Sequence, residues 1–383
     1  MSAGTMIQQK SCRNYRIRRM ALMLAAVLTV CFLFPACAGK NAGPNGTDPE
    51  ATAAETAEPL PTPEPETEMY MIAPEPNSLM ECYIIKTKAG KLIVIDGGLD
   101  GEGYDKPPYI LAALRAVAGK AEGEDIEVAA WFLSHAHKDH FTELSKVLNA
   151  YSPDTHLKID NFYFDFPPYG TKAFTGNNPD LAQLKQLMSG FDNYAAVNGI
   201  EVPEGESYYD YWNGRVANAE TIEAGLDITI DELRFEILQT WDKSDGNDVN
   251  SSSLVFRMHA GDRTVMFLHD LGESGGRRLY KKYGDELKSD IVHMAHHGQN
   301  GVTRSVYTKI AAETFLWSTP IWVWNDTKTY RIGETRKWVN DKVDFTEASE
   351  HHIVACLFTA YPADPTSIED WRGALPAMRV KLD

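Results

Sequence analysis

Three histidines and an aspartate stand close together in the sequence, at His135, His137, Asp139 and His140, directly after the apolar run 128–133. Neutral imidazole nitrogens and carboxylate oxygens are the donors that zinc and similar divalent ions select. On a helix, residues two apart do not share a face, and on a strand His140 would face away from the other three. We therefore expect a loop that leaves the strand end and folds around metal.

Four potential ligands on so short a segment exceed what one tetrahedral ion takes from a single loop, so the motif predicts two ions. Zinc is the expected metal, and manganese is the alternative. The chain has 11 histidines among 383 residues, which makes three within six positions a poor match to a chance surface loop.

The elements around the motif predict the class of fold. A hairpin is expected over 82–95 with its turn at 88–90, then a helix over 107–119 and a strand, apolar on both faces, over 126–133. Further helices are expected over 141–151, 179–196 and 274–287, and further strands over 156–166, 226–241 and 289–298. A second hairpin is expected over 251–270, with its turn at 260–262. Two β-rich blocks that alternate with helices favour an α/β fold of the αββα sandwich type over a doubly wound sheet.

The motif, one segment before it and two segments after it resemble the metallo-β-lactamase-fold hydrolases. The similar segments are LIVIDGG (92–98), VMFLHDLGES (265–274) and DIVHMAHHGQNG (290–301). Together with NSSSLVFRM (250–258), they look most like the extracellular ComEC-like branch of that superfamily. The resemblance covers residues 76–356 and implies a four-layered αββα metallo-β-lactamase sandwich.

The resemblance also implies a ligand set. One ion would be held by His135 and His137, the second by Asp139 and His140, with Asp270 bridging both and with His297, or alternatively His296, completing the second site. Asp96 would brace the metal loop from behind. The hydrolytic chemistry that this implies is attack by a hydroxide shared between two ions, with Asp139 and Asp270 as the catalytic carboxylates.

Several positions depart from the common pattern of these relatives. Glu143 stands where many relatives have glycine, and is expected to place a charge near the mouth of the site. Asn250 lies where ComEC-like relatives carry an asparagine that orients water or substrate. Tyr330 and Arg331 are the candidates to replace a late histidine that is missing here. A further metal-binding histidine, common in lactamases and lactonases, is also missing.

These features lead to a hydrolase of phosphodiester bonds as the first hypothesis. A lactam or lactone hydrolase, which cleaves a cyclic amide or ester, is the alternative, and the missing histidine argues against it. A non-catalytic surface binding lipoprotein that keeps the fold is the second alternative, and the complete ligand set argues against that.

The N-terminus resembles a bacterial export signal. Basic residues at 13–19 precede an apolar run at 20–34 and the small residues Ala36-Cys37-Ala38. We expect a signal peptide over 1–36, acylation of Cys37, a disordered Pro/Thr/Glu-rich tether over 37–68 and the hydrolase domain over 69–383. The protein would then be anchored by lipid to the outer face of the cell membrane. Cleavage after Ala38 with secretion, or a retained membrane anchor, are the alternatives.

Charge narrows the expected partners. The whole chain carries −17, residues 1–37 carry +5 and residues 38–68 carry −6, which leaves −16 on the body. Such a body repels polyanions, so a small-molecule or cell-envelope phosphoester is a better candidate substrate than nucleic acid. The membrane is expected to be contacted only through the N-terminal lipid. Whether Cys82 and Cys356 pair, and the oligomeric state, are left open.

Overall fold

The computed structural model describes residues 65–72, 79–98, 109–168, 171, 180–214, 222–299, 301–326, 328, 331–340, 352–355, 377–380 and 382. All of them belong to one unit, residues 63–383. The expected signal peptide, most of the tether, Cys37, Tyr330 and Cys356 lie outside the described residues. Within the described part, no helix is both long enough and apolar enough to cross a bilayer.

The first sheet contains the expected hairpin and the strand that carries the metal motif. Its order is β14-β1-β2-β3-β4-β5, with β6 also paired to β4. The strands are β1 Glu68–Ile72, β2 Tyr83–Lys86, β3 Leu92–Ile95, β4 Ile126–Phe132, β5 Leu157–Ile159, β6 Phe162–Tyr163 and β14 Ala377–Val380. Because β3 and β4 run parallel, Asp96 and the motif leave the sheet at the same edge.

The second sheet has the order β13-β12-β11-β10-β9-β8-β7. Its strands are β7 Asp227–Ile230, β8 Leu233–Gln239, β9 Val255–Ala260, β10 Arg263–Phe267, β11 Ile291–His293, β12 Thr314–Trp317 and β13 His352–Ala355. The strands β10, β11 and β12 are mutually parallel neighbours. The segments that follow them, with Asp270, His297 and Ser318, therefore emerge at one edge.

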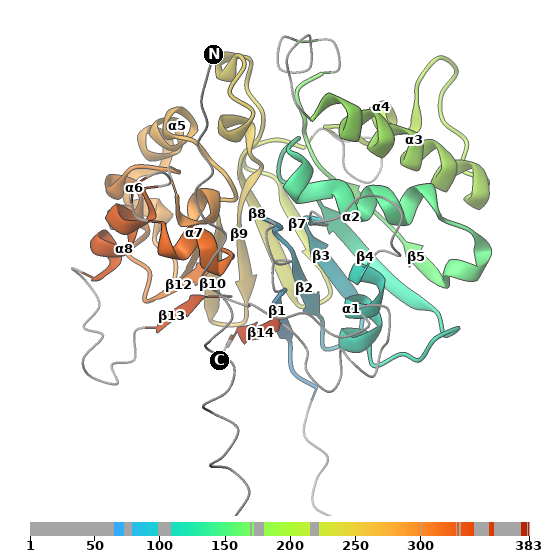
Figure 1. Cartoon of the computed structure of the whole chain (residues 1–383), viewed down its shortest axis with the longest axis horizontal. Coiled ribbons are helices and arrows are strands. Elements are labelled where there is room, and N and C mark those ends of the chain that lie inside the picture. Colours follow the sequence, from blue (N-terminus) through green and yellow to red (C-terminus); the bar gives the residue numbers. More distant parts are fainter. Residues whose placement is uncertain are drawn as a thin grey trace, which may run out of the picture. The chain divides into compact units, whose positions relative to one another are not determined.

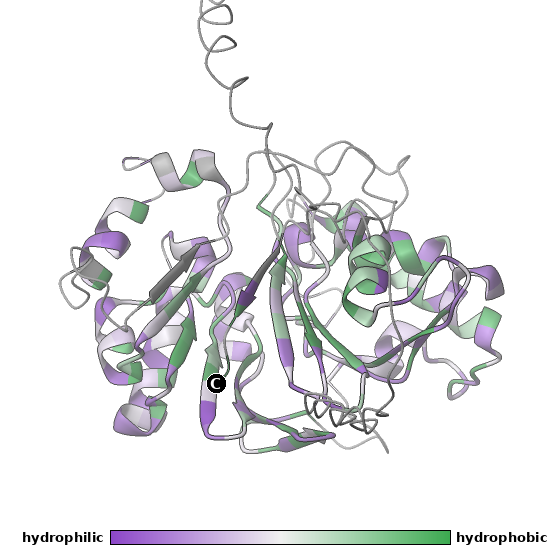
Figure 2. Cartoon of the chain, turned by 90° about the horizontal axis from the view of Figure 1, so that it is seen from below, coloured by the Kyte–Doolittle hydropathy of each residue, from purple (hydrophilic) through white to green (hydrophobic). Residues whose placement is uncertain are grey.

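Helices cover the outer face of each sheet (Figure 1). The first sheet is covered by α1 Tyr109–Ala118, α2 Lys138–Asn149, α3 Leu181–Asn198 and α4 Tyr208–Trp212. The second is covered by α5 Glu273–Tyr283, α6 Arg304–Ile310, α7 Ile321–Asn325 and α8 Ile332–Asn340. In Figure 2 many strand segments are coloured as hydrophobic, while the flanking helices carry both colours, as expected for helices with one buried face.

Three apolar clusters separate these layers. The central cluster joins the inner faces of both sheets and includes Tyr83, Phe132, Phe235, Phe256 and Phe267. The other two clusters lie between each sheet and its own helices. This is a four-layered αββα sandwich, so the predicted fold is confirmed.

The metal motif differs from the expected loop in one respect. The helix α2 begins at Lys138, so Asp139 and His140 lie in its first turn rather than on a loop. His137 is the N-cap, with extended backbone (φ −102°, ψ 143°). An acidic residue in the first helical turn is favourable because the unpaired N–H groups there carry partial positive charge. The prediction missed this helix start because it weighed only the ligand spacing.

The aromatic middle of the chain forms part of the core. Phe164, Phe191, Tyr208 and Tyr209 are almost fully buried, and α3 packs along α2. Their rings contact one another at centroid distances of 5.5 to 6.1 Å. These four residues belong to the cluster between the first sheet and its helices, so their role is in packing.

A glycine at the end of the 3-10 helix Ala295–Gly298, which follows β11, is required by packing. Gly298 has φ +76°, and a Cβ built there would overlap the indole of Trp317. We expect Gly298→Ala to lower the free energy of unfolding by about 3 kcal/mol, measured by urea denaturation. The matched control is Gly284→Ala, which has φ +50° but open space around it and should cost about 1 kcal/mol. Equal losses in the two variants would contradict the packing argument.

Candidate metal centre

Three segments from the two sheets meet at one edge of the sandwich. The first is the turn after β4 with the start of α2, the second is the turn after β10, and the third is the short 3-10 helix Ala295–Gly298 after β11. They bring together six residues that the sequence singled out, namely His135, His137, Asp139, His140, Asp270 and His297.

Two of these histidines form a first donor group with Asp270. The Nε2 atom of His135 lies 3.0 Å from Nδ1 of His137 and 3.8 Å from Oδ2 of Asp270. His135 is fully buried and His137 is partly exposed. This group could hold one ion with a side open to solvent.

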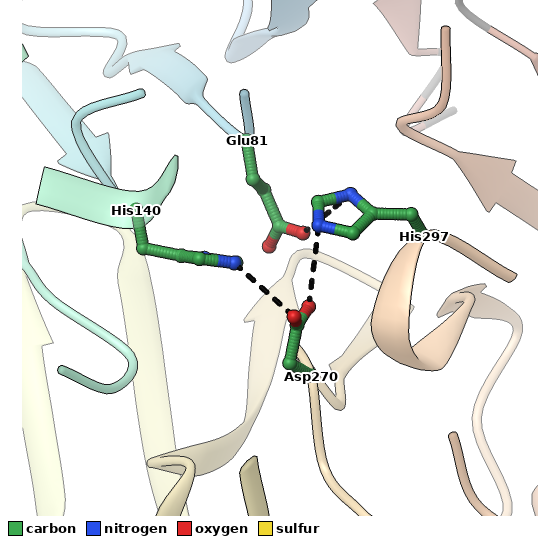
Figure 3. A group of neighbouring side chains, drawn as sticks. All are labelled: Glu81, His140, Asp270 and His297. Carbon is green, nitrogen blue, oxygen red and sulfur yellow. Dashed lines mark ion pairs between the residues drawn. The ribbon is translucent and has the colours of Figure 1, made fainter. Parts of the chain in front are cut away.

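The second donor group surrounds the same aspartate from the other side. The Nε2 atom of His140 lies 3.4 Å from Oδ2 of Asp270, and Nε2 of His297 lies 3.6 Å from Oδ1 (Figure 3). Asp139 completes the group, with its Oδ2 3.4 Å from Nε2 of His297 and 3.9 Å from Nε2 of His140. Asp270 thus turns one oxygen toward His297 and the other toward His135 and His140.

The outer nitrogen of each buried imidazole is held by the protein. Nδ1 of His140 lies 2.8 Å from the carboxylate of Asp96, and Nδ1 of His297 lies 2.9 Å from the carbonyl of Ser318. Since a carbonyl or carboxylate can only accept, each Nδ1 carries the proton and donates it. The neutral ring then has its lone pair on Nε2, which faces the centre. This is the orientation that metal-binding histidines need.

The donor set passes a test of fit for metal ions. Among the described residues, Nε2 of His140, Nε2 of His297 and Oδ1 of Asp270 are buried without a hydrogen-bond partner. Leaving such a group unpaired costs about 1–3 kcal/mol, so three that converge on one point need a common partner. Two ligands about 2.1 Å from one tetrahedral ion stand about 3.4 Å apart, close to the separations of the second group.

Electrostatics favours the ionised form of Asp270 and the neutral form of His135, but it favours the protonated form of His297 until a metal ion binds. Burial alone would raise the pKa of Asp270, but His297 and His140 lower it well below its usual value. Burial, aided by His140, lowers the pKa of His135. Burial would also lower the pKa of His297, but Asp270 and Asp139 raise it to about 9. Positive charge is therefore favoured between the two aspartates, and a bound divalent ion would displace the imidazole proton.

The two adjacent late histidines have different surroundings. The side chain of His297 is fully buried and points between Asp139 and Asp270. That of His296 is 26% exposed, with Nε2 3.7 Å from Oδ2 of Asp270. The Nδ1 atom of His297 contacts the carbonyl of Ser318, which fixes the orientation of the ring. This geometry favours His297 as the ligand and leaves His296 on the solvent side.

Behind the second donor group lies a buried network that the sequence did not predict. Its centre is Glu81, whose Oε1 lies 3.0 Å from Nδ1 of His269 and whose Oε2 lies 3.0 Å from Nε2 of His293. All three side chains are fully buried. Nδ1 of His269 is also 3.3 Å from Asp96, which holds His140. The network therefore connects Glu81 to a metal-facing histidine through two intermediates.

This network could itself be mistaken for a metal site. The backbone N–H of His269 donates to Nδ1 of His293 at 3.1 Å, so the proton of a neutral His293 ring is on Nε2. That Nε2 lies 3.0 Å from Oε2 of Glu81, at ion-pair distance, but among the described residues neither atom has a hydrogen-bond partner. The hydrogen bond of His269 to Glu81 and the contact of His269 with Asp96 connect this cluster to the centre as a support. One sequence signal could have indicated it, a lone acidic residue within the apolar run 79–85.

Asp96 positions the metal motif through hydrogen bonds to Ser134 and His140. Its Oδ1 accepts from the backbone N–H of Ser134 at 2.7 Å, and its Oδ2 accepts from the Ser134 hydroxyl at 2.8 Å. Ser134 directly precedes His135, and its hydroxyl lies 3.0 Å from Nδ1 of that ring. One carboxylate therefore orients ligands of both donor groups, since it also contacts His140.

The expectation for Glu143 was wrong. Its side chain is 1% exposed and lies 3.4 Å from the ammonium of Lys146, which is also buried. As the residue belongs to the face of α2 that packs inward, its charge is internal and is not at the mouth of the site. The prediction assumed that the motif continued as an exposed loop.

The remaining candidates are not joined to the donor groups by any described contact. Asn250 lies in the short 3-10 helix Asn250–Ser252, with Oδ1 buried and without a hydrogen-bond partner among described residues. Arg331 is 54% exposed and pairs with Glu334 at 2.7 Å. His156 pairs with Asp125, and His259 pairs with Glu236. Neither of these two histidines supplies a further ligand.

Comparisons with known proteins agree with this picture. A family model described as "Metallo-beta-lactamase superfamily" matches residues 81–313. Competence protein ComA of Neisseria gonorrhoeae is 32% identical over 77 residues, which is 20% of this chain and 11% of that protein's length.

Solved structures similar to this chain include YhfI of Bacillus subtilis, a metallo-beta-lactamase fold protein, and CmlA of Streptomyces venezuelae, a diiron beta-hydroxylase. For YhfI the identity is 11%, the coverage 76% of this chain and 98% of that chain, and the TM-score 0.37. For CmlA the identity is 12%, the coverage 68% and 46%, and the TM-score 0.36. The chain thus spans less than half the length of CmlA.

The Glu81 network predicts a selective effect on metal binding. We expect Glu81→Gln to weaken the affinity of the second donor group about 10- to 100-fold, because Asp96 and His140 lose the support of His269. Titration with cobalt, followed by its absorption spectrum, measures the two ions separately. Asp245→Asn is the matched control, a largely buried carboxyl that pairs with Arg278, and should bind both ions normally. Equal weakening of both ions, or none, would contradict the prediction.

Proposed function

The chain belongs to the metallo-β-lactamase superfamily, a family of metal-dependent hydrolases, and we propose that it hydrolyses phosphodiester bonds with two divalent ions. The observation that carries this proposal is the convergence of five donor residues on Asp270, with buried Nε2 and Oδ1 atoms that lack hydrogen-bond partners among the described residues. We assign His135 and His137 to one ion. We assign Asp139, His140 and His297 to the other, with Asp270 shared.

Bound at this place, two divalent ions would supply a hydroxide near neutral pH and neutralise negative charge on the substrate. The donor set of imidazoles and carboxylates suits zinc, with manganese as the alternative. The carboxylates contribute negative charge that balances the ions, and Asp96 and Ser318 keep the imidazoles fixed so that little reorganisation is needed.

The open side of the centre indicates how substrate approaches. His137 is partly exposed, Asp139 is 15% exposed and His296 is 26% exposed, whereas the other donors are at most 2% exposed. Burial lowers the pKa of His296, which keeps its ring neutral near pH 7. We propose that Asp139 orients the nucleophile and that His296 contacts the phosphate from the solvent side.

The ligand inventory favours phosphodiesters over cyclic amides or esters. Within the described residues, the first donor group has only two imidazoles, because His156 and His259 are held elsewhere and His269 lies behind the centre. An ion held so sparsely has room for a phosphate oxygen. A lactam or lactone hydrolase is the second candidate. A non-catalytic binding protein is the third, and the complete set of donors argues against it.

We also propose an extracytoplasmic location, with the protein tethered by lipid on Cys37 and acting on a small-molecule or cell-envelope phosphoester. The basic and apolar pattern of residues 13–34 supports this, and the net charge of −16 on the body disfavours nucleic acid. The local likeness to the competence protein supports placement in the ComEC-like branch.

The reaction can be tested directly. We expect the zinc or manganese protein to hydrolyse an aryl phosphodiester, and a chelator to abolish turnover reversibly, because both ions are needed for the nucleophile. Release of the aryl alcohol is followed by absorbance, with nitrocefin and a lactone as comparison substrates. Faster turnover of either comparison substrate would favour the second candidate, and no metal-dependent turnover of any would reject the proposal.

The bridging role of Asp270 gives a second prediction. Elemental analysis of residues 69–383 should find about two ions in the wild type and one or none in Asp270→Ala, because both donor groups share that carboxylate. His259→Ala, which removes a histidine paired with Glu236 on the hairpin of β9, should retain two ions. Retention of both ions by Asp270→Ala would refute the assignment.

A further inference from the structure

A cavity of about 280 Å³ opens where α5, α6 and α8 approach the segment after His297. Its lining includes Gln299, Val302, Arg304, Arg331, Thr335 and Trp338. This volume is at the lower end of the roughly 300–1,000 Å³ range of small-molecule sites, so it suits one small ring rather than an oligomer.

The cavity wall is continuous with the metal centre along the chain. The backbone N–H of Gln299 donates to the carbonyl of His296 at 2.8 Å, closing a tight turn around His297. The hydroxyl of Thr335 donates to the carbonyl of Gln299 at 3.2 Å and ties this turn to α8. Another lining residue, Glu273, follows Asp270 by only three residues. Two lining residues therefore lie within three positions of a metal-facing residue in the sequence.

Two buried polar residues form part of the lining. Gln299 is 6% exposed and Thr335 is 2% exposed. The Nε2 amide group of Gln299 has no hydrogen-bond partner among the described residues. An amide that is buried without a partner costs free energy, so this group is suited to a ligand that accepts a hydrogen bond.

The charges on the rim are already compensated. Arg331 pairs with Glu334 at 2.7 Å, and Glu273 pairs with Arg277 at 2.6 Å. A charged ligand would have to compete with these pairs, but their remaining N–H and oxygen sites can still bond to hydroxyl groups. Trp338 adds an aromatic surface to the lining. Planar polar side chains beside an aromatic ring match the alternating hydroxyl and apolar faces of a sugar.

We propose that this cavity binds an uncharged polyhydroxyl group, one sugar ring in size, attached to the phosphate whose other ester bond is cleaved. The assignment rests on the proposed phosphodiesterase function. It identifies Gln299 and Arg331 as specificity-determining residues that do not take part in the bond cleavage itself.

The test uses two aryl phosphodiesters that share a leaving group. In one the second ester is formed by a hexose, and in the other by ethanol. We expect the metal-loaded wild type to prefer the hexosyl substrate about tenfold in kcat/KM. Gln299→Leu and Arg331→Ala should each remove most of this preference, chiefly through KM, while turnover of the ethyl substrate changes less than about twofold. Lys337→Ala, on α8 but outside the cavity, is the matched control and should behave as the wild type.

The outcomes separate the two proposals. Turnover of the ethyl substrate without a preference for the hexosyl one, or equal losses on both substrates in the variants, would overturn the sugar subsite and leave the phosphodiesterase intact. If neither diester is cleaved, the proposed function fails. Isothermal titration calorimetry then compares the affinity of the protein for a hexose phosphate monoester with its affinity for ethyl phosphate, which tests the sugar subsite separately. Tighter binding of the hexose ester that is lost in Arg331→Ala supports it, and equal binding of the two esters overturns it.

Discussion

The structure depends on a small volume of buried polar atoms around Asp270 that the protein does not satisfy by itself. Each unpaired group there is unfavourable by about 1–3 kcal/mol, so the surrounding fold must stabilise them or a cation must. The fold holds the outer nitrogens of the ligand histidines, for example through Asp96 on His140 and Ser318 on His297. The inner atoms, which face one another without partners, are placed to bind divalent ions.

Strain accumulates at the same place. Eight described residues other than glycine have positive φ, and four of them belong to this region, namely Asp96, His269, His296 and His297. A left-handed backbone at such residues is unfavourable, and it persists where the surroundings hold it. Here the sandwich supplies that rigidity, because the parallel strands β3, β4, β10, β11 and β12 end at the same edge and direct their turns toward one another.

The two sides of the centre have different environments. The side toward the sheets is buried, with Glu81, Asp96, His269 and His293 fully buried and His269 in contact with both carboxylates. The side toward solvent offers His137, Asp139 and His296, and the turn through His297 leads into the lined cavity. Chemistry and substrate selection can therefore be tuned separately, because the residues that orient the donors are not those that line the cavity.

The sequence by itself predicted the sandwich, the two hairpins and the histidine-rich motif, because strand periodicity and ligand spacing are local properties of the chain. Asp270 and the late histidines were predicted only from the resemblance to known hydrolases. Only the tertiary structure decided which late histidine turns inward, where α2 begins and that Glu143 is internal. It alone showed Glu81 beside His269, a contact between residues 188 positions apart. That contact is set by how two sheets pack, and no local pattern encodes packing across such a separation.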